Sequence, residues 1–377
     1  MNKEKKQTPF NRRNFLIGLG AGSSLLGAGF LTAGVGGCTL KQKQLSSVKP
    51  QSPYLIERET TDEGFSRGWM PHFAPNEDQW VDMHVHIKDL TGRDSLKTLL
   101  DEWFLKLDTY RLGKIVAITE QDELFDVFGE IAQNDTRFAW MFWPKINAPS
   151  LSKIREAVRN GSRAIKLHNA PVMTGEVPRN IWQSDEWQEI FAYLAEAGIP
   201  LMWHITNRTN YSPYHGGGLH PYWGQGWAKG VTFTNENLLQ DALALMRRFP
   251  KLKIIGAHQL YVGIDRLNQL LKEYENLYIE SSCGMYLRWA DDFSDDTRQL
   301  LREFVETWSE RILFGSDALL FPGSIDDYAV QSFLCHARFM LKLWINDKAL
   351  QDVAWRTTCR LLKLEPGKWV RHGYVRP

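Results

Sequence analysis

The chain has 377 residues, of which 43% are hydrophobic and 24% are charged, and its formal net charge at pH 7 is +1. This length and balance exclude a small module and a disordered chain, and they permit one large domain or two ordinary ones. The nearly neutral charge gives no basic surface for nucleic acid.

The first 38 residues differ in composition from the rest of the chain. Basic residues precede an uncharged, glycine-rich apolar run that ends at Cys38, which is the layout of a secretory signal. A transmembrane anchor is the alternative, and the many glycines in the run argue against it. The pair Arg12 and Arg13, followed by "NFL", resembles the twin-arginine class of signals. That resemblance implies the twin-arginine export machinery as a partner, and this machinery carries folded proteins across a membrane.

The end of the apolar run and the segment after it suggest a tethered domain. The sequence "VGGC" at residues 35–38 resembles a lipoprotein processing site, although Leu is commoner than Val35 at the first position. The resemblance implies that Cys38 carries a lipid and that the exported domain stays on the membrane, in the periplasm or another extracytoplasmic space. Residues 39–77 are polar and are expected to form a tether.

Cysteine and tryptophan contents bear on the kind of site that follows. After Cys38 the cysteines are Cys283, Cys335 and Cys359, an odd number without CxxC spacing, so we expect buried free thiols rather than a disulfide framework or a thiolate zinc site. The 15 tryptophans suit an aromatic or carbohydrate ligand, but packing of bulky side chains in a large barrel is the favoured explanation.

Short apolar runs alternate with helical patterns over residues 78–365. Eight strand-helix units predict an α/β fold, a (β/α)8 TIM barrel, followed by a tail at 366–377. A doubly wound open sheet is the alternative, but no glycine-rich phosphate turn follows the first strand. The predicted strands lie at 80–87, 114–120, 138–146, 163–169, 200–206, 253–259, 276–282 and 311–317.

The connection at 207–233, after the fifth strand, lacks a helical pattern and is rich in aromatic residues and glycine. Structureless loops of this length are rare unless they are functional, and this one follows a strand end where barrel active sites form. Its aromatic and histidine side chains are candidates for a lid or an aromatic wall, with Tyr214 and Trp223 as the candidate substrate contacts; the others are Tyr211, His215, His220, Tyr222 and Trp227. The alternatives are a contact in a homo-oligomer and a surface Ω-loop. Arg288, after the seventh strand, could clamp a carboxylate, although surface arginines are commoner.

The first strand, "WVDMHVHI", carries two histidines at its end. Asp82, His84 and His86 share one parity, whereas Val81, Met83, Val85 and Ile87 share the other. Parallel barrel strands have no wet face, so the apolar set is expected to face the helices. His84 and His86 are then predicted to point into the barrel.

Other strands end with similar residues: Lys166 and His168, His204, His258 and Asp317. A lone inward histidine is usually a core residue, but these strand ends converge on one barrel mouth. Imidazole and carboxylate groups there would form an open nitrogen and oxygen site suited to zinc, iron(II) or manganese, with a position left for water.

The ordered set of motifs "DMHVH", "KLH", "GAH" and "FGSD" resembles the amidohydrolase superfamily, in particular its amidohydrolase-related branch. The resemblance spans about Trp80 to Leu364. That branch includes nonoxidative decarboxylases and lactone hydrolases.

The resemblance implies roles for the polar strand ends. His84, His86, His204 and Asp317 would hold one divalent metal, most simply zinc, with iron or manganese as alternatives. His258 would stand beside the activated water as a catalytic base. Asp317 would serve both as a ligand and as a proton shuttle.

Lys166 and His168 stay open at this stage. In binuclear amidohydrolases a lysine on the fourth strand is carboxylated and bridges two metals, but sites in this branch usually hold one. An unmodified Lys166 would pair with a carboxylate such as Asp317 or hold an anionic substrate. His168 would contact substrate or pack in the core.

These observations predict a metal-dependent hydrolase that directs water at the carbonyl of a small-molecule ester, lactone or amide. A nonoxidative decarboxylase of an aromatic or dienic acid would use the same ligand set. A ligand-binding lipoprotein without catalysis is a third alternative, which would not require all five histidine and aspartate side chains.

Overall fold

A computed structural model of the chain describes residues 79–207, 221–283, 294–323, 325 and 327–365. The predicted signal, tether and tail lie outside these residues, as do Arg12, Arg13, Cys38, Tyr211, Tyr214, His215, His220 and Arg288. The described part contains one sheet of parallel strands in the order β8-β7-β6-β5-β4-β3-β2-β1-β9. The strands are β1 (Trp80–Ile87), β2 (Leu112–Thr119), β3 (Phe138–Phe142), β4 (Ile165–His168), β5 (Leu201–His204), β6 (Ile254–Gly256), β7 (Leu277–Glu280), β8 (Ile312–Leu313) and β9 (Ala318–Leu320).

The sheet closes on itself through its last two strands. β8 pairs with β7, and β9 pairs with β1. Only Phe314–Asp317 separates β8 from β9, so the two are halves of one interrupted eighth strand. Within the interruption, the N–H of Met83 donates to the carbonyl of Phe314 at 3.0 Å. The (β/α)8 TIM barrel predicted from the sequence is confirmed.

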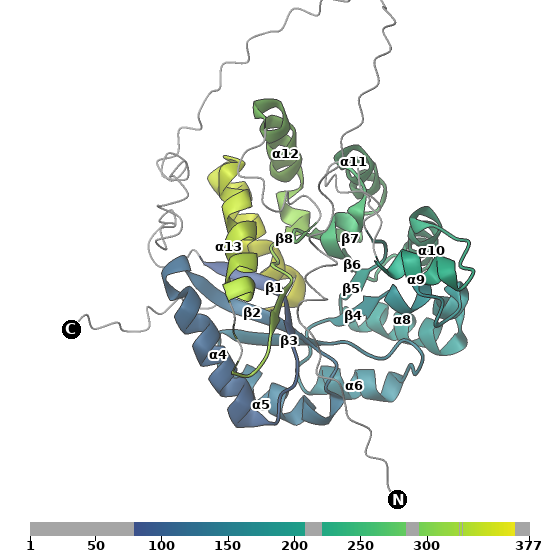
Figure 1. Ribbon diagram of the computed structural model, residues 1–377, viewed down its shortest axis with the longest axis horizontal. Helices are drawn as coiled ribbons and strands as arrows, with labels where there is room; N and C mark the ends of the chain where they lie inside the picture. The colour runs from purple at the N-terminus through teal and green to yellow at the C-terminus, as the bar shows by residue number, and fades with distance from the viewer. Residues whose placement is uncertain (1–78, 208–220, 284–293, 324, 326, 366–377) are drawn as a thin grey trace, which may run out of the picture. The chain divides into compact units, whose positions relative to one another are not determined.

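Helices follow most of the strands. In Figure 1 the strands lie at the centre and helices such as α4, α5, α8 and α12 lie around them. The helices are α4 (Arg93–Leu107), α5 (Phe125–Asn134), α6 (Leu151–Arg159), α7 (Ala170–Met173), α8 (Asp185–Ala197), α9 (Pro221–Ala228), α10 (Asn235–Arg248), α11 (Ile264–Glu273), α12 (Asp295–Trp308), α13 (Asp327–Lys342), α14 (Asp347–Gln351) and α15 (Thr357–Leu362).

Helix α8 shows how the sequence sets these boundaries. The hydroxyl of Ser184 accepts the N–H of Trp187 at the start of the helix, and Gly198 takes a left-handed conformation at its end. Its buried residues recur at helical spacing and face the sheet: Trp187, Ile190, Phe191 and Leu194.

Two apolar layers hold the barrel together. Along β5, Leu201 and Trp203 belong to the layer between sheet and helices, whereas Met202 belongs to a smaller cluster inside the barrel. The inner cluster also contains Cys359 and Leu362 from the C-terminal helix. In the described part of the chain, six tryptophans are almost fully buried in this packing, which favours the packing interpretation of the tryptophan content: Trp80, Trp103, Trp140, Trp187, Trp203 and Trp223.

The predicted orientation of β1 is half wrong. Val85 and Ile87 face the helices as expected, but Val81 and Met83 belong to the cluster inside the barrel. The pairing of β1 with β2 shifts register between Asp82 and Val85, as at a β-bulge, and such a bulge reverses the alternation of side chains. The odd-numbered Val81 and Met83 before the bulge and the even-numbered His84 and His86 after it therefore all point into the barrel.

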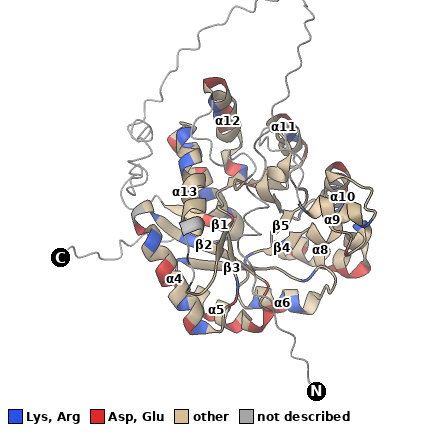
Figure 2. Cartoon of the chain, in the orientation of Figure 1, with Lys and Arg blue, Asp and Glu red and all other residues tan. Residues whose placement is uncertain are grey.

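Charges of both signs are mixed over the outer helices. Figure 2 shows Lys and Arg interspersed with Asp and Glu on α4, α5 and α12. Such a surface offers no single-sign patch over these helices for a nucleic acid. Among the described residues, no helix is long and apolar enough to cross a membrane.

The segment at 207–233 contains a helix, contrary to the sequence prediction. Helix α9 begins at a proline, which is favourable at the first helical position, and it packs against α7. A Cβ at Gly226 would lie 1.9 Å from the carbonyl oxygen of Met173. The glycines that suggested an irregular loop therefore include one that allows two helices to approach closely.

Two glycines of α9 form a matched pair for testing this packing. Gly226→Ala should lower the free energy of unfolding by about 1–3 kcal/mol, because the new methyl group would push α9 off α7. Gly224→Ala has nothing within 4 Å of its Cβ and should be neutral or stabilising by up to about 1 kcal/mol. Urea titration of both variants measures the difference, and equal stabilities would contradict the contact.

Candidate metal centre and active site

The end of β1 brings two imidazoles together. Nε2 of His84 lies 3.1 Å from Nε2 of His86, and the rings are tilted with centroids 5.1 Å apart. The His84 side chain is 1% exposed and that of His86 is 15% exposed. The two side chains thus direct ring nitrogens at each other inside the barrel mouth.

Asp317 completes a triangle with these histidines. It sits in the gap between β8 and β9 in a left-handed conformation, with φ of 54°. Its Oδ1 is 3.2 Å from Nε2 of His84 and 3.4 Å from Nε2 of His86. Ligand atoms at 2.0–2.1 Å from a tetrahedral zinc are separated by about 3.3 Å. The three atoms are therefore spaced as ligands of one ion would be.

Asp82 connects the strand that carries His84 and His86 with the segment that carries Asp317. Its Oδ1 accepts the N–H of His84 at 3.2 Å and that of Ser316 at 3.0 Å, and its Oδ2 accepts the Ser316 hydroxyl at 2.5 Å. Complete burial raises the pKa of Asp82 to about 7, although these three donors oppose the shift. One carboxyl group thus fixes β1 against the residue before Asp317.

Strands β4 and β5 supply the next wall. His168 and His204 are register partners, and their ring centroids are 4.0 Å apart. Nδ1 of His168 accepts the N–H of Ala170 at 2.8 Å, so a neutral His168 carries its proton on Nε2 and offers no lone pair there. Nε2 of His204, by contrast, is buried with no hydrogen-bond partner. His204 therefore fits the part of a ligand better than His168 does.

Lys166 lies below these rings, almost fully buried. Its Nζ is 3.4 Å from Nε2 of His84. Burial lowers the pKa of Lys166 to about 8, while the negative charges of Asp317 and Glu280 oppose the shift. The amine is thus predominantly a cation at neutral pH, held close to the triangle.

His258 follows β6 in a turn of unusual backbone. His258, Gln259, Leu260 and Tyr261 all have positive φ, a conformation that is costly for side chains other than glycine. The turn places the centroid of the His258 ring 5.2 Å from that of His84 and 4.6 Å from that of His204. Burial lowers the pKa of His258 to about 4, so its imidazole is neutral at pH 7.

Glu280, at the end of β7, is a site residue that the sequence prediction missed. It is fully buried, and its Oε2 lies 3.1 Å from Nδ1 of His84. Burial acts to raise the pKa of Glu280, but His84, His258 and the hydroxyl of Ser282 outweigh it and hold the pKa at about 2. Its position at the C-terminal end of a predicted strand, at inward parity, was the signal available in the sequence.

Two aromatic rings border the mouth. Trp143, after β3, stacks on His168 at 5.8 Å and meets His86 edge-on at 5.5 Å. Tyr222 of α9 meets the other side of His168 at 5.7 Å. Trp143 was also missed, because it was counted within a predicted strand.

The sequence matches the family model described as "Amidohydrolase" over residues 114–369, about two thirds of the chain. The chain belongs to the amidohydrolase family. It is an enzyme of that family, whose members generally depend on metal. The match begins after β1, so the assignment of His84 and His86 to the amidohydrolase site rests on their geometry.

Solved structures resemble this amidohydrolase at low sequence identity. The structure of 5-carboxyvanillate decarboxylase LigW from Sphingomonas paucimobilis is 15% identical, with a TM-score of 0.50 over 76% of this chain and 99% of that one. Dihydroorotase from Campylobacter jejuni is 18% identical, with a TM-score of 0.47 over 78% of this chain and 86% of the other. A search of curated proteins finds no match.

The donor set of this amidohydrolase fits a divalent metal. His84, His258 and Asp317 offer ligand atoms that all lie within 4.8 Å of one another. The tighter triangle of His84, His86 and Asp317 overlaps this group. The ring of His204, whose Nε2 has no hydrogen-bond partner, lies with its centroid 4.6 Å from that of His258 and is a further candidate donor. Neutral imidazoles and an ionised carboxylate are the forms in which these groups bind metal.

The structure does not gather all the predicted residues. The strand-end set lies together at the mouth: His84, His86, Lys166, His168, His204, His258 and Asp317. Trp223 is 2% exposed and packs edge-on against Phe233, which favours a structural role over substrate contact. Tyr214 and Arg288 lie outside the described residues.

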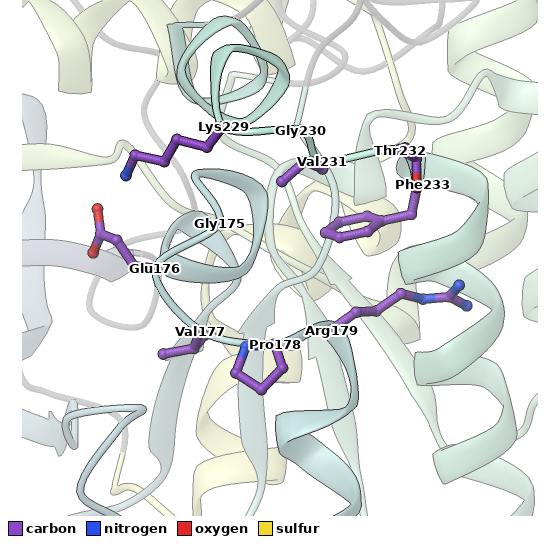
Figure 3. A pocket seen from close by; sticks show the side chains of 10 residues that line it. All are labelled: Gly175, Glu176, Val177, Pro178, Arg179, Lys229, Gly230, Val231, Thr232 and Phe233. Atoms are coloured by element: carbon purple, nitrogen blue, oxygen red, sulfur yellow. The ribbon is translucent and has the colours of Figure 1, made fainter.

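A separate surface cavity of about 450 Å³ lies between the loop after α7 and the loop after α9. Figure 3 shows Phe233 and Val231 on one side of it, with Lys229 and Glu176 extended toward each other on the other. None of its lining residues belongs to the histidine cluster. This cavity is therefore not lined by the proposed metal ligands.

Variants of the donor residues should empty the metal site. His84→Ala, His204→Ala and Asp317→Ala are each expected to reduce bound metal well below about one ion per chain, because each removes a ligand. Elemental analysis of the purified proteins measures this. His336→Ala is the matched control, since both ring nitrogens of this buried histidine already face backbone partners, Cys283 and Ser332. Full metal content in all three ligand variants would contradict the assignment.

Proposed function

We propose that this amidohydrolase is a metal-dependent hydrolase that directs water at the carbonyl of a small ester, lactone or amide. The observation that carries the proposal is the triangle of His84, His86 and Asp317 at the open end of the barrel, with a neutral histidine beside it. The open end of a TIM barrel is where its substrates bind.

The proposed cofactor is one divalent ion, zinc first. Two imidazoles and one carboxylate, with His204 as a further donor, form a set that zinc prefers and that iron(II) and manganese also accept. Such an ion would lower the pKa of a water molecule and polarise the substrate carbonyl. A second ion would require carboxylation of Lys166, and a cationic Lys166 favours a single ion.

His258 and Asp317 are the proposed proton carriers. The low pKa of His258 leaves its imidazole free to accept a proton at pH 7. Asp317 directs Oδ1 at the histidines, whereas its Oδ2 faces the thiol of Cys283 at 3.7 Å. The thiol donates to one lone pair of Oδ2, and the other lone pair would take the proton of the attacking water and return it to the leaving group.

Lys166 and the aromatic rings suggest the kind of substrate. Lys166 places a buried cation beside the triangle, and Trp143 and Tyr222 flank His168 at the rim. A small molecule with a flat or apolar body and a negative charge would complement these groups. His168 would donate from Nε2 to such a substrate.

The buried cation also favours a second candidate, a nonoxidative decarboxylase. An aromatic or dienic acid would place its carboxylate near Lys166 with the same ligand set beneath it. One of the similar structures is that of a decarboxylase, but at 15% identity the likeness supports the fold alone.

A paired assay separates the two activities. The zinc-loaded protein is expected to hydrolyse at least one class in a panel of esters, lactones and amides, without releasing CO2 from aromatic acids. Proton release measures hydrolysis of the esters and lactones, and release of the amine measures hydrolysis of the amides. His258→Ala should retain its metal and lose turnover by about 10²- to 10⁴-fold, because the base is removed. CO2 release without hydrolysis would favour the decarboxylase. Loss of metal from His258→Ala would place His258 in the ligand set.

We also propose that the protein is exported by the twin-arginine machinery and held on the membrane through a lipid on Cys38. The support is the sequence of residues 1–38. Replacement of Arg12 and Arg13 by lysine should leave the precursor in the cytoplasm, as shown by cell fractionation, because this class of signal requires the arginine pair. Cys38→Ala should separate anchoring from export. Normal export of the lysine variant would refute the twin-arginine assignment.

A further inference from the structure

Glu280 has no role in the proposed catalytic steps, yet both of its carboxylate oxygens are hydrogen-bonded within the site. Its Oε1 accepts the N–H of Ser282 at 2.5 Å, and its Oε2 accepts the N–H of His258 at 3.2 Å. The Ser282 hydroxyl and Nδ1 of His84 also approach Oε2, at 2.9 and 3.1 Å. A Cβ at Gly315 would lie 2.3 Å from Oε1, so a glycine is needed where the carboxylate meets the interrupted strand.

The hydrogen bonds to Glu280 determine the tautomer of His84. Backbone N–H groups only donate, so both carboxylate oxygens act as acceptors. Nδ1 of His84 must therefore carry the proton that it shares with Oε2. The lone pair of a neutral His84 is then on Nε2, the atom that faces His86 and Asp317.

Ser282 extends the hydrogen bonds of Glu280 to His258. The single hydroxyl proton of Ser282 is donated to Glu280, so Oγ of Ser282 acts as an acceptor toward Nδ1 of His258, 2.9 Å away. The carbonyl oxygen of Ser282 lies 3.3 Å from the same Nδ1 and can only accept. His258 thus carries its proton on Nδ1, and its Nε2 is left as a base.

We propose that Glu280 is a positioning residue that sets the tautomers of two histidines, His84 directly and His258 through Ser282. A carboxylate behind a ligating histidine fixes its orientation and raises its basicity. Here one carboxylate serves a metal ligand and a proton acceptor at once. The roles of the two histidines rest on the proposed function, but their tautomers depend on the hydrogen bonds of the chain alone.

The tautomers can be measured without turnover. In metal-free full-length protein with ¹⁵N-labelled histidine, long-range ¹H–¹⁵N spectra distinguish protonated from unprotonated ring nitrogens. His84→Gln and His258→Gln assign the signals. The wild type should show both histidines protonated on Nδ1. Ser282→Ala removes the nearer of two acceptors of Nδ1 of His258 and keeps the backbone carbonyl, so it should weaken the preference of His258 for a proton on Nδ1 and lower kcat. At His84 the variant removes only a 3.4 Å contact with Nδ1 and leaves the 3.1 Å contact with Glu280, so the tautomer of His84 and the affinity for Zn²⁺ should be retained.

Glu280→Gln should affect both histidines and weaken Zn²⁺ binding by about 10- to 100-fold, measured by competition with a chelator. Ser281→Ala is the matched control, since that hydroxyl accepts the N–H of Gly315 and contacts neither histidine. A wild-type proton on Nε2 of His84 or His258 would overturn the proposal, as would unchanged Zn²⁺ affinity in Glu280→Gln. If Glu280→Gln does not fold, the wild-type and Ser282→Ala spectra still decide. Absence of hydrolysis with the expected tautomers would refute the proposed function and leave this assignment standing.

Discussion

Closure of the barrel between β1 and the interrupted eighth strand is the constraint on which the site depends. β1 lies between β2 and β9, so the strand that bears His84 and His86 is also the strand that closes the sheet. Because of the gap at Phe314–Asp317, Asp317 does not have regular strand geometry, and its carboxylate lies beside the rings of those histidines. Asp82 then joins the two sides through three hydrogen bonds. The contacts that close the barrel therefore also position the proposed metal ligands.

The mouth concentrates polar groups that would be costly to bury singly. Burial lowers the pKa values of His84, His204 and His258, which keeps these rings neutral and ready to act as acceptors. Glu280 and Asp317 stay ionised, because the neighbouring histidines outweigh the effect of burial on their pKa values. The site therefore combines neutral bases, two anions and the cation of Lys166 within one network.

The sequence was sufficient for the architecture and for much of the candidate site, for a simple physical reason. In a parallel barrel all strands end on one face, so polar residues at strand ends must meet, as His84, His204, His258 and Asp317 do. Local pattern could not reveal the bulge in β1, since a bulge is defined by the register with a partner strand. Glu280 went unnoticed because its importance comes from contacts across the barrel. Helix α9 was missed because glycines suggested an irregular loop, whereas one of them, Gly226, allows α9 to approach α7 closely.

The side chains of the triangle differ in their access to solvent. The exposed fraction rises from 1% for His84 to 15% for His86 and 33% for Asp317. Behind His84, the fully buried Glu280 closes the other side. The triangle is therefore most open at Asp317, where the chain has a left-handed conformation between two short strands. The most exposed of the three proposed ligands is thus the one that the interrupted strand carries, and the most enclosed is the one in contact with Glu280.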